Sequence, residues 1–125
     1  MVVLDTHILI WYALADPALA IARVRQIEAA APRVFISSIT LWEAQMLLER
    51  GRVSGFTIAD LRKAIAVSGF QEAVLSGDMA VLSRRLALPH QDPADRFIAA
   101  TSVTLRATLY TDDANLIGHP WLLTA

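Results

Sequence analysis

Short apolar runs alternate along the chain with longer segments of helical periodicity. Continuous apolar runs rich in β-branched residues are typical of parallel strands buried on both faces. Strand candidates, the third of them the weakest, lie at residues 2–4, 33–36, 71–75 and 108–110, with a further edge strand at 121–123. Helices are predicted at residues 7–14, 17–30, 38–50, 58–67, 77–86 and 93–106, with a short one at 113–117. Strands separated by helices predict an α/β protein, a three-layer α/β/α sandwich around a mostly parallel sheet.

Polar residues mark where these helices begin. Asp16, which precedes a proline, is placed as the N-cap of the helix at residues 17–30. Ser37, Ser38 or Thr40 is expected to cap the next helix.

Composition narrows the class of protein. The chain has 125 residues, of which 55% are hydrophobic and 18% charged, so it is expected to fold as a single domain over residues 1–125. It contains no cysteine, which excludes disulfides, thiolate metal sites and cysteine nucleophiles. A net charge of −1 excludes an overall basic surface that would coat nucleic acid.

The N-terminal segment has neither signal-peptide nor membrane character. It lacks a basic start, and its apolar stretch contains Asp5 and His7. The longest charge-free run, residues 6–15, is far shorter than the roughly 20 residues that span a bilayer. We therefore expect no membrane segment and a cytoplasmic location.

Four acidic residues lie either directly after a predicted strand or near the start of a predicted helix. They are Asp5, Glu43, Asp95 and Asp113. The carboxyl ends of parallel strands share one edge of a sheet, so these side chains are expected to converge there. Clustered carboxylates raise one another's pKa unless a cation neutralises them. Oxygen ligands favour Mg²⁺ or Mn²⁺, which can activate water for attack on a phosphodiester.

Each of these acids also has a purely structural interpretation. Glu43 matches a capping box with Thr40. Asp92 precedes a proline, as an N-cap does, and this role is favoured for it. Asp95 would be stabilised near a helix N-terminus, and Asp112 and Asp113 are placed to cap the short last helix.

Other polar residues give weaker signals. His7, His90 and His119 are too scattered to indicate a general-base arrangement, and structural or surface roles are favoured. Arg96 is expected either to balance the acidic charge or to bind a substrate phosphate. The basic pair at residues 62–63 is expected on a solvated helix face.

Together these residues make the chain resemble the PIN-domain ribonucleases, especially the VapC-type toxins of prokaryotic toxin–antitoxin pairs. Four motifs match in order: Leu4-Asp5-Thr6-His7 with Trp11; Ser37-Ser38 through Trp42-Glu43; Asp92-Pro93-Ala94-Asp95-Arg96 running into Ile98-Ala99-Ala100-Thr101; and Thr111-Asp112-Asp113. They extend across nearly the whole chain. The resemblance therefore implies a PIN-like fold.

The resemblance also implies a site and an activity. Asp5, Glu43, Asp95 and Asp113 would form the acidic metal site, with Thr111 supporting it through its hydroxyl. The implied activity is Mg²⁺- or Mn²⁺-dependent endonucleolytic cleavage of RNA. The implied partners are an RNA substrate, a cognate VapB-type antitoxin that inhibits the toxin, and a second copy of the chain in a homodimer.

Two other functions remain open on the sequence alone. One is a non-catalytic PIN-like module that binds RNA or protein, and the other is a metal-dependent phosphatase acting on small phosphoesters. The high apolar content also predicts an exposed contact surface for the antitoxin, at residues 7–14 and 50–67. An antitoxin arginine could there reach Asp5 and Asp95.

Overall fold

A computed structural model describes residues 1–125, and a fully parallel four-stranded sheet forms its centre. The strands are β1 (Val2–Leu4), β2 (Val34–Ser37), β3 (Gln71–Ala73) and β4 (Thr108–Tyr110). Their order across the sheet is β3-β2-β1-β4, and Val3 of β1 lies opposite Phe35 and Leu109. The chain runs outward from β1 through β2 to β3 and then returns to the other side of β1 as β4, which places the topological switch between β1 and β4.

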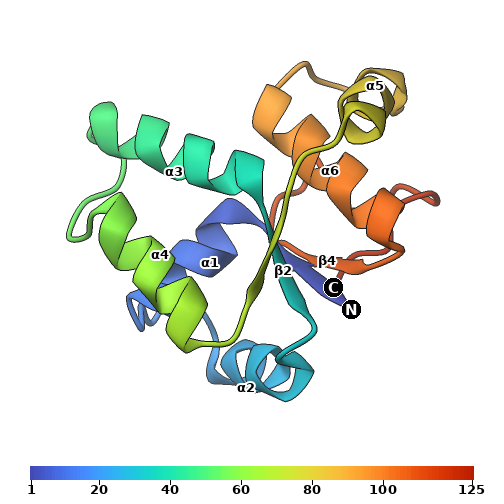
Figure 1. Ribbon diagram of the computed structural model, residues 1–125. Helices are drawn as coiled ribbons and strands as arrows, with labels where there is room; N and C mark the ends of the chain where they lie inside the picture. The colour runs from blue at the N-terminus through green and yellow to red at the C-terminus, as the bar shows by residue number, and fades with distance from the viewer.

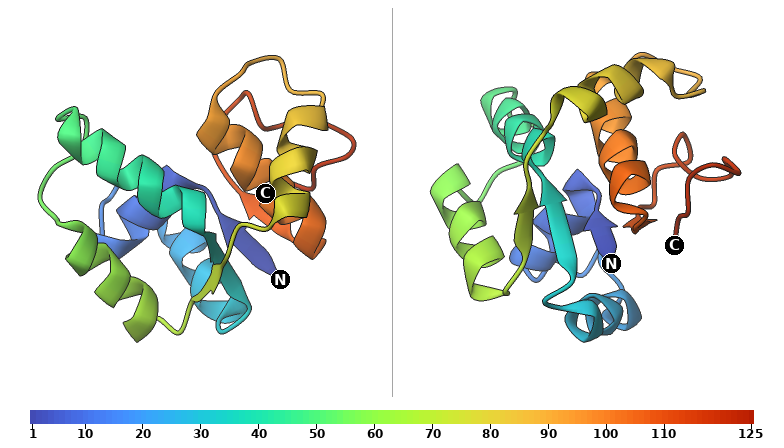
Figure 2. Two further views of the ribbon diagram at one scale, coloured as in Figure 1. Left: turned by 45° about the horizontal axis from the view of Figure 1, so that its top comes forward. Right: turned by 45° about the vertical axis from the view of Figure 1, so that its right-hand side comes forward.

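Six helices surround the sheet: α1 (Thr6–Ala13), α2 (Ile21–Ala30), α3 (Ser38–Glu49), α4 (Ile58–Val67), α5 (Gly77–Arg85) and α6 (Pro93–Leu105). Figure 1 shows α1, α2 and α4 on one side of the sheet and α5 and α6 on the other. The two rotated views in Figure 2 give the same arrangement, with α3 continuing from the carboxyl end of β2. The predicted three-layer α/β/α sandwich is confirmed.

Alternating side chains of β1, β2 and β4 enter two separate cores, whereas Gln71 and Glu72 of the edge strand β3 are exposed. Val2 and Leu4 pack with α1, α2 and α4, whereas Val3 packs against α6. Successive residues of a strand point to opposite faces, and both faces are covered, so β1 is apolar throughout. Burial on both faces explains why the strands appear in the sequence as continuous apolar runs.

The second helix begins later than predicted. Asp16 caps a turn instead of a helix, because its carboxylate accepts a hydrogen bond from the backbone of Ala18 at 2.8 Å. Leu19 then enters the core and Ala20 is extended, so α2 starts only at Ile21. Burial of Leu19 therefore determines the path of this segment, against the local signal of the Asp-Pro pair.

The C-terminal segment also differs from the prediction. Residues 113–117 form successive turns instead of a helix, with the backbone of Leu116 bonded to Asp113 three residues earlier. The predicted edge strand at 121–123 is reduced to one parallel bridge, between Thr124 and Leu109. Gly118 has a φ of +92°, a left-handed conformation that a continuing helix does not contain.

The other helices match their predicted positions within a few residues. Ser37 is the N-cap of α3, one of the three candidates. None of the helices combines the length and the apolar character that crossing a membrane requires.

Candidate active site

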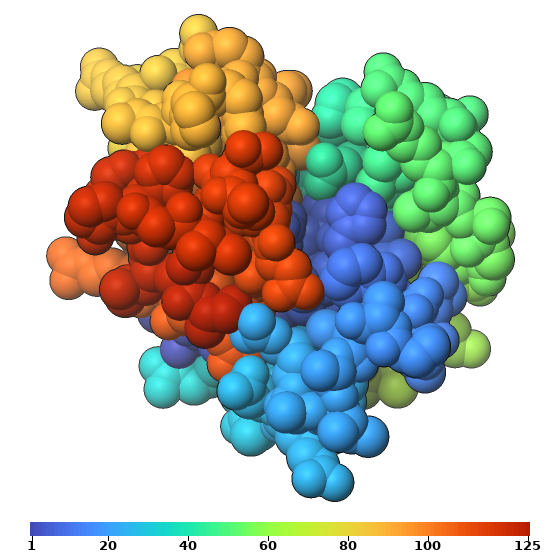
Figure 3. Space-filling view, turned by 180° about the vertical axis from the view of Figure 1, so that it is seen from behind, coloured from blue at the N-terminus to red at the C-terminus, as the bar shows by residue number.

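The four predicted acids all reach one cleft at the carboxyl edge of the sheet. Asp5 follows β1, Glu43 projects from α3, Asp95 lies in the first turn of α6, and Asp113 follows β4. The cleft has a volume of about 470 Å³. In Figure 3 it is the hollow between the green segment that contains α3 and the orange segments, with the blue α1 segment at its base. Residues from four distant parts of the sequence thus share one cleft.

Asp5 is held by a hydrogen-bond chain that links β1 to the segment after β4. One carboxylate oxygen accepts from the backbone of Thr6 at 2.8 Å, so Asp5 is the N-cap of α1. The other accepts from the Thr111 hydroxyl at 2.6 Å. That hydroxyl in turn accepts from the backbone N–H of Asp113 at 3.0 Å. The implied support from the Thr111 hydroxyl is therefore present as a direct hydrogen bond.

The three acids that lie closest to one another include Asp92, for which the sequence favoured a helix-capping role. Glu43, Asp92 and Asp95 each place a carboxylate oxygen within 4.8 Å of the others. Asp92 does cap α6, through Oδ1, which accepts from the backbones of Ala94 and Asp95 at 2.9 and 3.3 Å. A carboxylate has two oxygens, so capping and membership of the cluster are compatible.

The capping-box interpretation of Glu43 is wrong. Thr40 is fully buried within α3, and the helix is capped by Ser37 instead. Glu43 therefore lies well inside the helix, where backbone N–H groups already have partners, and its half-buried side chain faces the cleft.

Burial and mutual repulsion raise the pKa values of three of the acids. Burial is the largest cause for each of them. The pKa of Asp95 rises from 3.8 to about 8, through burial and then through the charges of Asp92 and Asp5. The pKa of Glu43 is raised by burial and by Asp5. The pKa of Asp5 is raised by burial, although the Thr111 hydrogen bond lowers it.

The donor set fits a hard divalent cation. It consists of carboxylate oxygens alone, and no cysteine is present to favour a softer metal. The raised pKa values mean that these groups gain from a positive charge at their centre. Glu43, Asp92 and Asp95 are placed to hold the ion, with Asp5 and Asp113 lining the same cleft.

Arg96 has neither of the two predicted roles. Its side chain is buried, with the residue 5% exposed, and it does not line the cleft. The guanidinium donates hydrogen bonds of 2.9 to 3.2 Å to four backbone carbonyls, those of Ser83, Leu86, Leu88 and His90. Arg96 therefore fixes the connection between α5 and α6, which leads directly to Asp92.

That connection also brings a histidine to the acidic group. His90 Nε2 lies 3.2 Å from Oδ2 of Asp95. Sequence spacing gave no reason to pair them, because the contact depends on the loop path that Arg96 holds. Asp112 lines the cleft at its rim, 62% exposed and 3.8 Å from Arg23, so of the two adjacent acids Asp113 is the one turned further from solvent.

The fold and the cleft define a parallel α/β protein with an acidic site at the switch in its sheet. The sequence profile of the PIN domain matches residues 2–120, and the chain belongs to the PIN-domain family. No curated protein matches the chain. The resemblance inferred from the four motifs is confirmed at the level of this family.

Two solved structures share the fold over the full chain. One is VapBC2 from Rickettsia felis bound to a DNA fragment from its promoter, with a TM-score of 0.72 and 20% identity, covering 100% of this chain and 98% of that one. The other is a toxin–antitoxin complex from Klebsiella pneumoniae, with a TM-score of 0.66 and 25% identity, covering 99% and 97%.

Proposed function

We propose that this PIN domain is a metal-dependent endoribonuclease and the toxin of a type II toxin–antitoxin pair. The observation that carries the proposal is the convergence of acids from four separate segments in one cleft, with raised pKa values. Such an arrangement is unfavourable for folding by itself, and buried acids with raised pKa values are typical of functional sites. Family membership supports a nuclease, and the matched toxin–antitoxin complexes support the toxin assignment.

The acidic side chains of the cleft have different proposed roles. Bound Mg²⁺ or Mn²⁺ would supply an activated water and stabilise charge on the phosphodiester. Glu43, Asp92 and Asp95 would hold the ion, and Asp5 is oriented by Thr111 so that its carboxylate keeps a fixed position. Asp113 adds negative charge from the segment after β4 and contributes its backbone N–H to the same hydrogen-bond chain.

Replacement of Asp5 tests the nuclease. Asp5→Asn keeps an oxygen that can accept from Thr6 and removes one charge at constant volume, so we expect the fold to persist and cleavage to be abolished. Purified protein would be incubated with mixed RNA and Mn²⁺, with EDTA as a parallel arm. Asp78→Asn, in exposed α5, is the matched control and should cut normally. Full activity of Asp5→Asn would refute the assignment.

The same assay separates the alternatives. RNA binding without cleavage by the unaltered protein would favour the non-catalytic module. Release of phosphate from mononucleotides, without cleavage of RNA, would favour the phosphatase. We propose that residues 1–125 act as one PIN unit in the cytoplasm, where the RNA substrate is found.

A VapB-type antitoxin and a second copy of the chain are the proposed partners. The surface predicted for them is accessible only in part, because Ile8, Leu9 and Ile10 of α1 are buried in the core. The C-terminal part of α1 and the end of α4 line an apolar groove together with α2, where Ile21 is 71% and Val67 79% exposed. Light scattering should report a dimer, and co-purification with the neighbouring gene product should report the antitoxin.

A further inference from the structure

Two arginines line the cleft at a distance from its acids. Arg50 is the C-cap residue of α3, and Arg52 follows two residues later. Both are exposed, and both line the same cleft as the carboxylates. The three ion pairs of the protein use other side chains, and no side-chain hydrogen bond engages either guanidinium. These two cations therefore face the cleft without a partner in the protein.

The placement of Arg50 follows from the helical repeat. Glu43, Met46, Leu47 and Arg50 all line the cleft, and their spacing of i, i+3, i+4 and i+7 defines one face of α3. Seven residues correspond to about 10 Å along a helix axis. One face of α3 thus carries a carboxylate at the acidic end of the cleft and a cation about 10 Å away.

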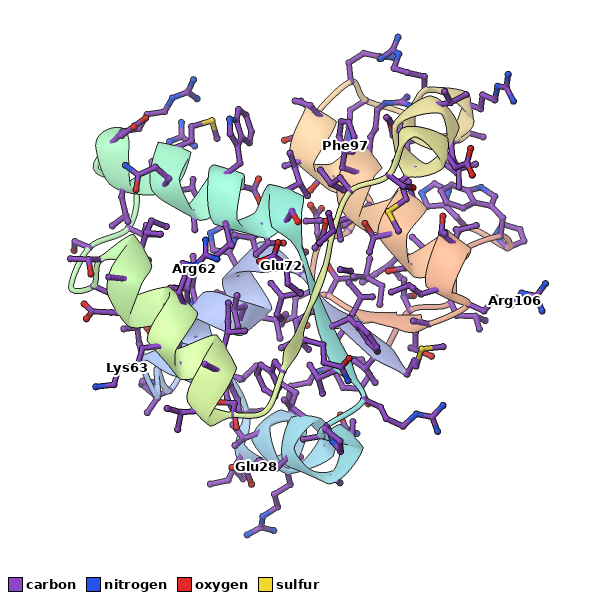
Figure 4. The ribbon with its side chains drawn as sticks, in the orientation of Figure 1. Glu28, Arg62, Lys63, Glu72, Phe97 and Arg106 are labelled. Carbon is purple, nitrogen blue, oxygen red and sulfur yellow. The ribbon has the colours of Figure 1, made fainter.

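A nucleic acid that enters this cleft needs positively charged side chains to offset the repulsion between its phosphates and the acids. Six of the thirteen residues that line the cleft are Asp or Glu, and only two are Arg or Lys. Each nucleotide of a substrate brings a negative phosphate, and one divalent ion leaves most of the carboxylate charge in place. The basic pair at residues 62–63 cannot supply this charge. Arg62 and Lys63 lie on α4 outside the cleft, where Figure 4 labels both, and Arg62 lies 3.8 Å from Glu72.

We propose that Arg50 and Arg52 form a phosphate subsite that holds the RNA backbone beside the scissile phosphate. This inference rests on the proposed function, because it takes RNA as the substrate. A guanidinium donates two parallel hydrogen bonds to the oxygens of one phosphate. Because the RNA backbone is flexible, a phosphate can make this contact with either arginine. The distance along α3 assigns the subsite to a phosphate next to the cleaved one, leaving the acidic end for the reaction.

The α1 side of the cleft supports a single-stranded substrate. His7 and Trp11 both line it, with ring centroids 5.8 Å apart, and His7 is exposed. Aromatic rings beside a cationic backbone site are the usual means of binding single strands, through stacking of unpaired bases. The subsite therefore places phosphates against α3 and bases toward α1.

The experiment measures RNA binding, separately from cleavage. A fluorescent single-stranded RNA is titrated with protein in EDTA, by anisotropy, from about 50 to 200 mM KCl. Each phosphate contact on a single strand contributes roughly 0.7 to the slope of log K against log salt. Arg50→Ala/Arg52→Ala should therefore lower the slope by about 1.4 and weaken binding about tenfold at low salt.

Two further variants make the result specific. Arg25→Ala/Arg33→Ala removes the same charge from exposed positions outside the cleft and should leave the slope unchanged. Arg50→Lys/Arg52→Lys keeps both charges and should keep the slope. In the cleavage assay with Mn²⁺, Arg50→Ala/Arg52→Ala should raise KM and preserve kcat. Urea midpoints should match, because both side chains are exposed.

The outcomes separate the two proposals. An unchanged slope in Arg50→Ala/Arg52→Ala, an equal loss in the surface control, or no RNA binding by the unaltered protein would overturn the phosphate subsite. Loss of cleavage in every sample, with the slope difference intact, would instead refute the nuclease and leave the subsite standing.

Discussion

Replacing Asp95 with asparagine removes the carboxylate whose ionisation the cleft opposes most. Its pKa rises from 3.8 to about 8 on folding, through burial and the neighbouring carboxylates. Below pH 3.8 both the folded and the unfolded chain are protonated at this site. Between the two values the unfolded chain loses the proton while the folded chain keeps it, so the free energy of unfolding falls as pH rises. Above pH 8 both are ionised and the penalty is constant.

The size of the effect follows from this window. At pH 7, which lies roughly 3 pH units above the ordinary pKa of 3.8, the effect has an upper limit of about 4 kcal/mol. Water in the open cleft screens part of it, and we expect about 2 kcal/mol. Loss of a carboxylate from the first turn of α6 opposes this by about 0.3 to 1 kcal/mol. The first effect is larger, so Asp95→Asn should stabilise the metal-free protein.

Urea unfolding in EDTA, followed by tryptophan fluorescence between pH 4 and 9, measures this directly. The free energy of unfolding of Asp95→Asn minus that of the unaltered protein should be near zero at pH 4, reach about 1 to 1.7 kcal/mol at pH 7 and level off above pH 8. Asp112→Asn, at the exposed rim, should show no such rise. A difference for Asp95→Asn that does not change with pH would refute the reasoning.

Metal should reverse the order of stability. Mn²⁺ at about 100 times its dissociation constant stabilises a protein that binds it by about 2.7 kcal/mol. The unaltered protein should then exceed Asp95→Asn, whose site has lost one of its three closest carboxylates. If Mn²⁺ stabilises both proteins equally, Asp95 does not hold the ion.

Two further predictions concern residues that act through the acids. Thr111→Val removes the 2.6 Å hydrogen bond that lowers the pKa of Asp5, so Mn²⁺ affinity measured by calorimetry at pH 7 should fall about tenfold, while Thr111→Ser should retain it. Arg96→Met leaves four backbone carbonyls without their donor and should lower the free energy of unfolding by about 3 kcal/mol. Arg85→Met, at an exposed position of α5, is the control and should lower it by less than about 0.5 kcal/mol.

The sequence predicts where the acids converge because that depends on strand direction. Asp5 directly follows a short buried strand, and parallel strands bring their carboxyl ends together. The same reasoning placed Asp113 after β4. Neither inference needs side-chain contacts, which is why both positions could be predicted without a structure.

Contacts that depend on the path of a loop could not be predicted in this way. The four carbonyls bound by Arg96 come from a connection without regular structure, and its shape also decides that His90 meets Asp95. For Asp92 the sequence favoured capping and left a metal-site role open, because sequence patterns describe a residue and not the separate contacts of its two oxygens.

The helix termini show why the cleft still needs a cation. Asp5 caps α1, Asp92 caps α6, and Asp95 lies in the first turn of α6, so three of the acids lie at the positive ends of helices. Each such contact contributes about 0.3 to 1 kcal/mol. The pKa of Asp95 is nevertheless raised to about 8, so the helix termini do not balance burial and repulsion. The fold brings the carboxylates together without compensating their negative charge. A bound divalent cation would supply that compensation, so metal binding should stabilise the folded protein.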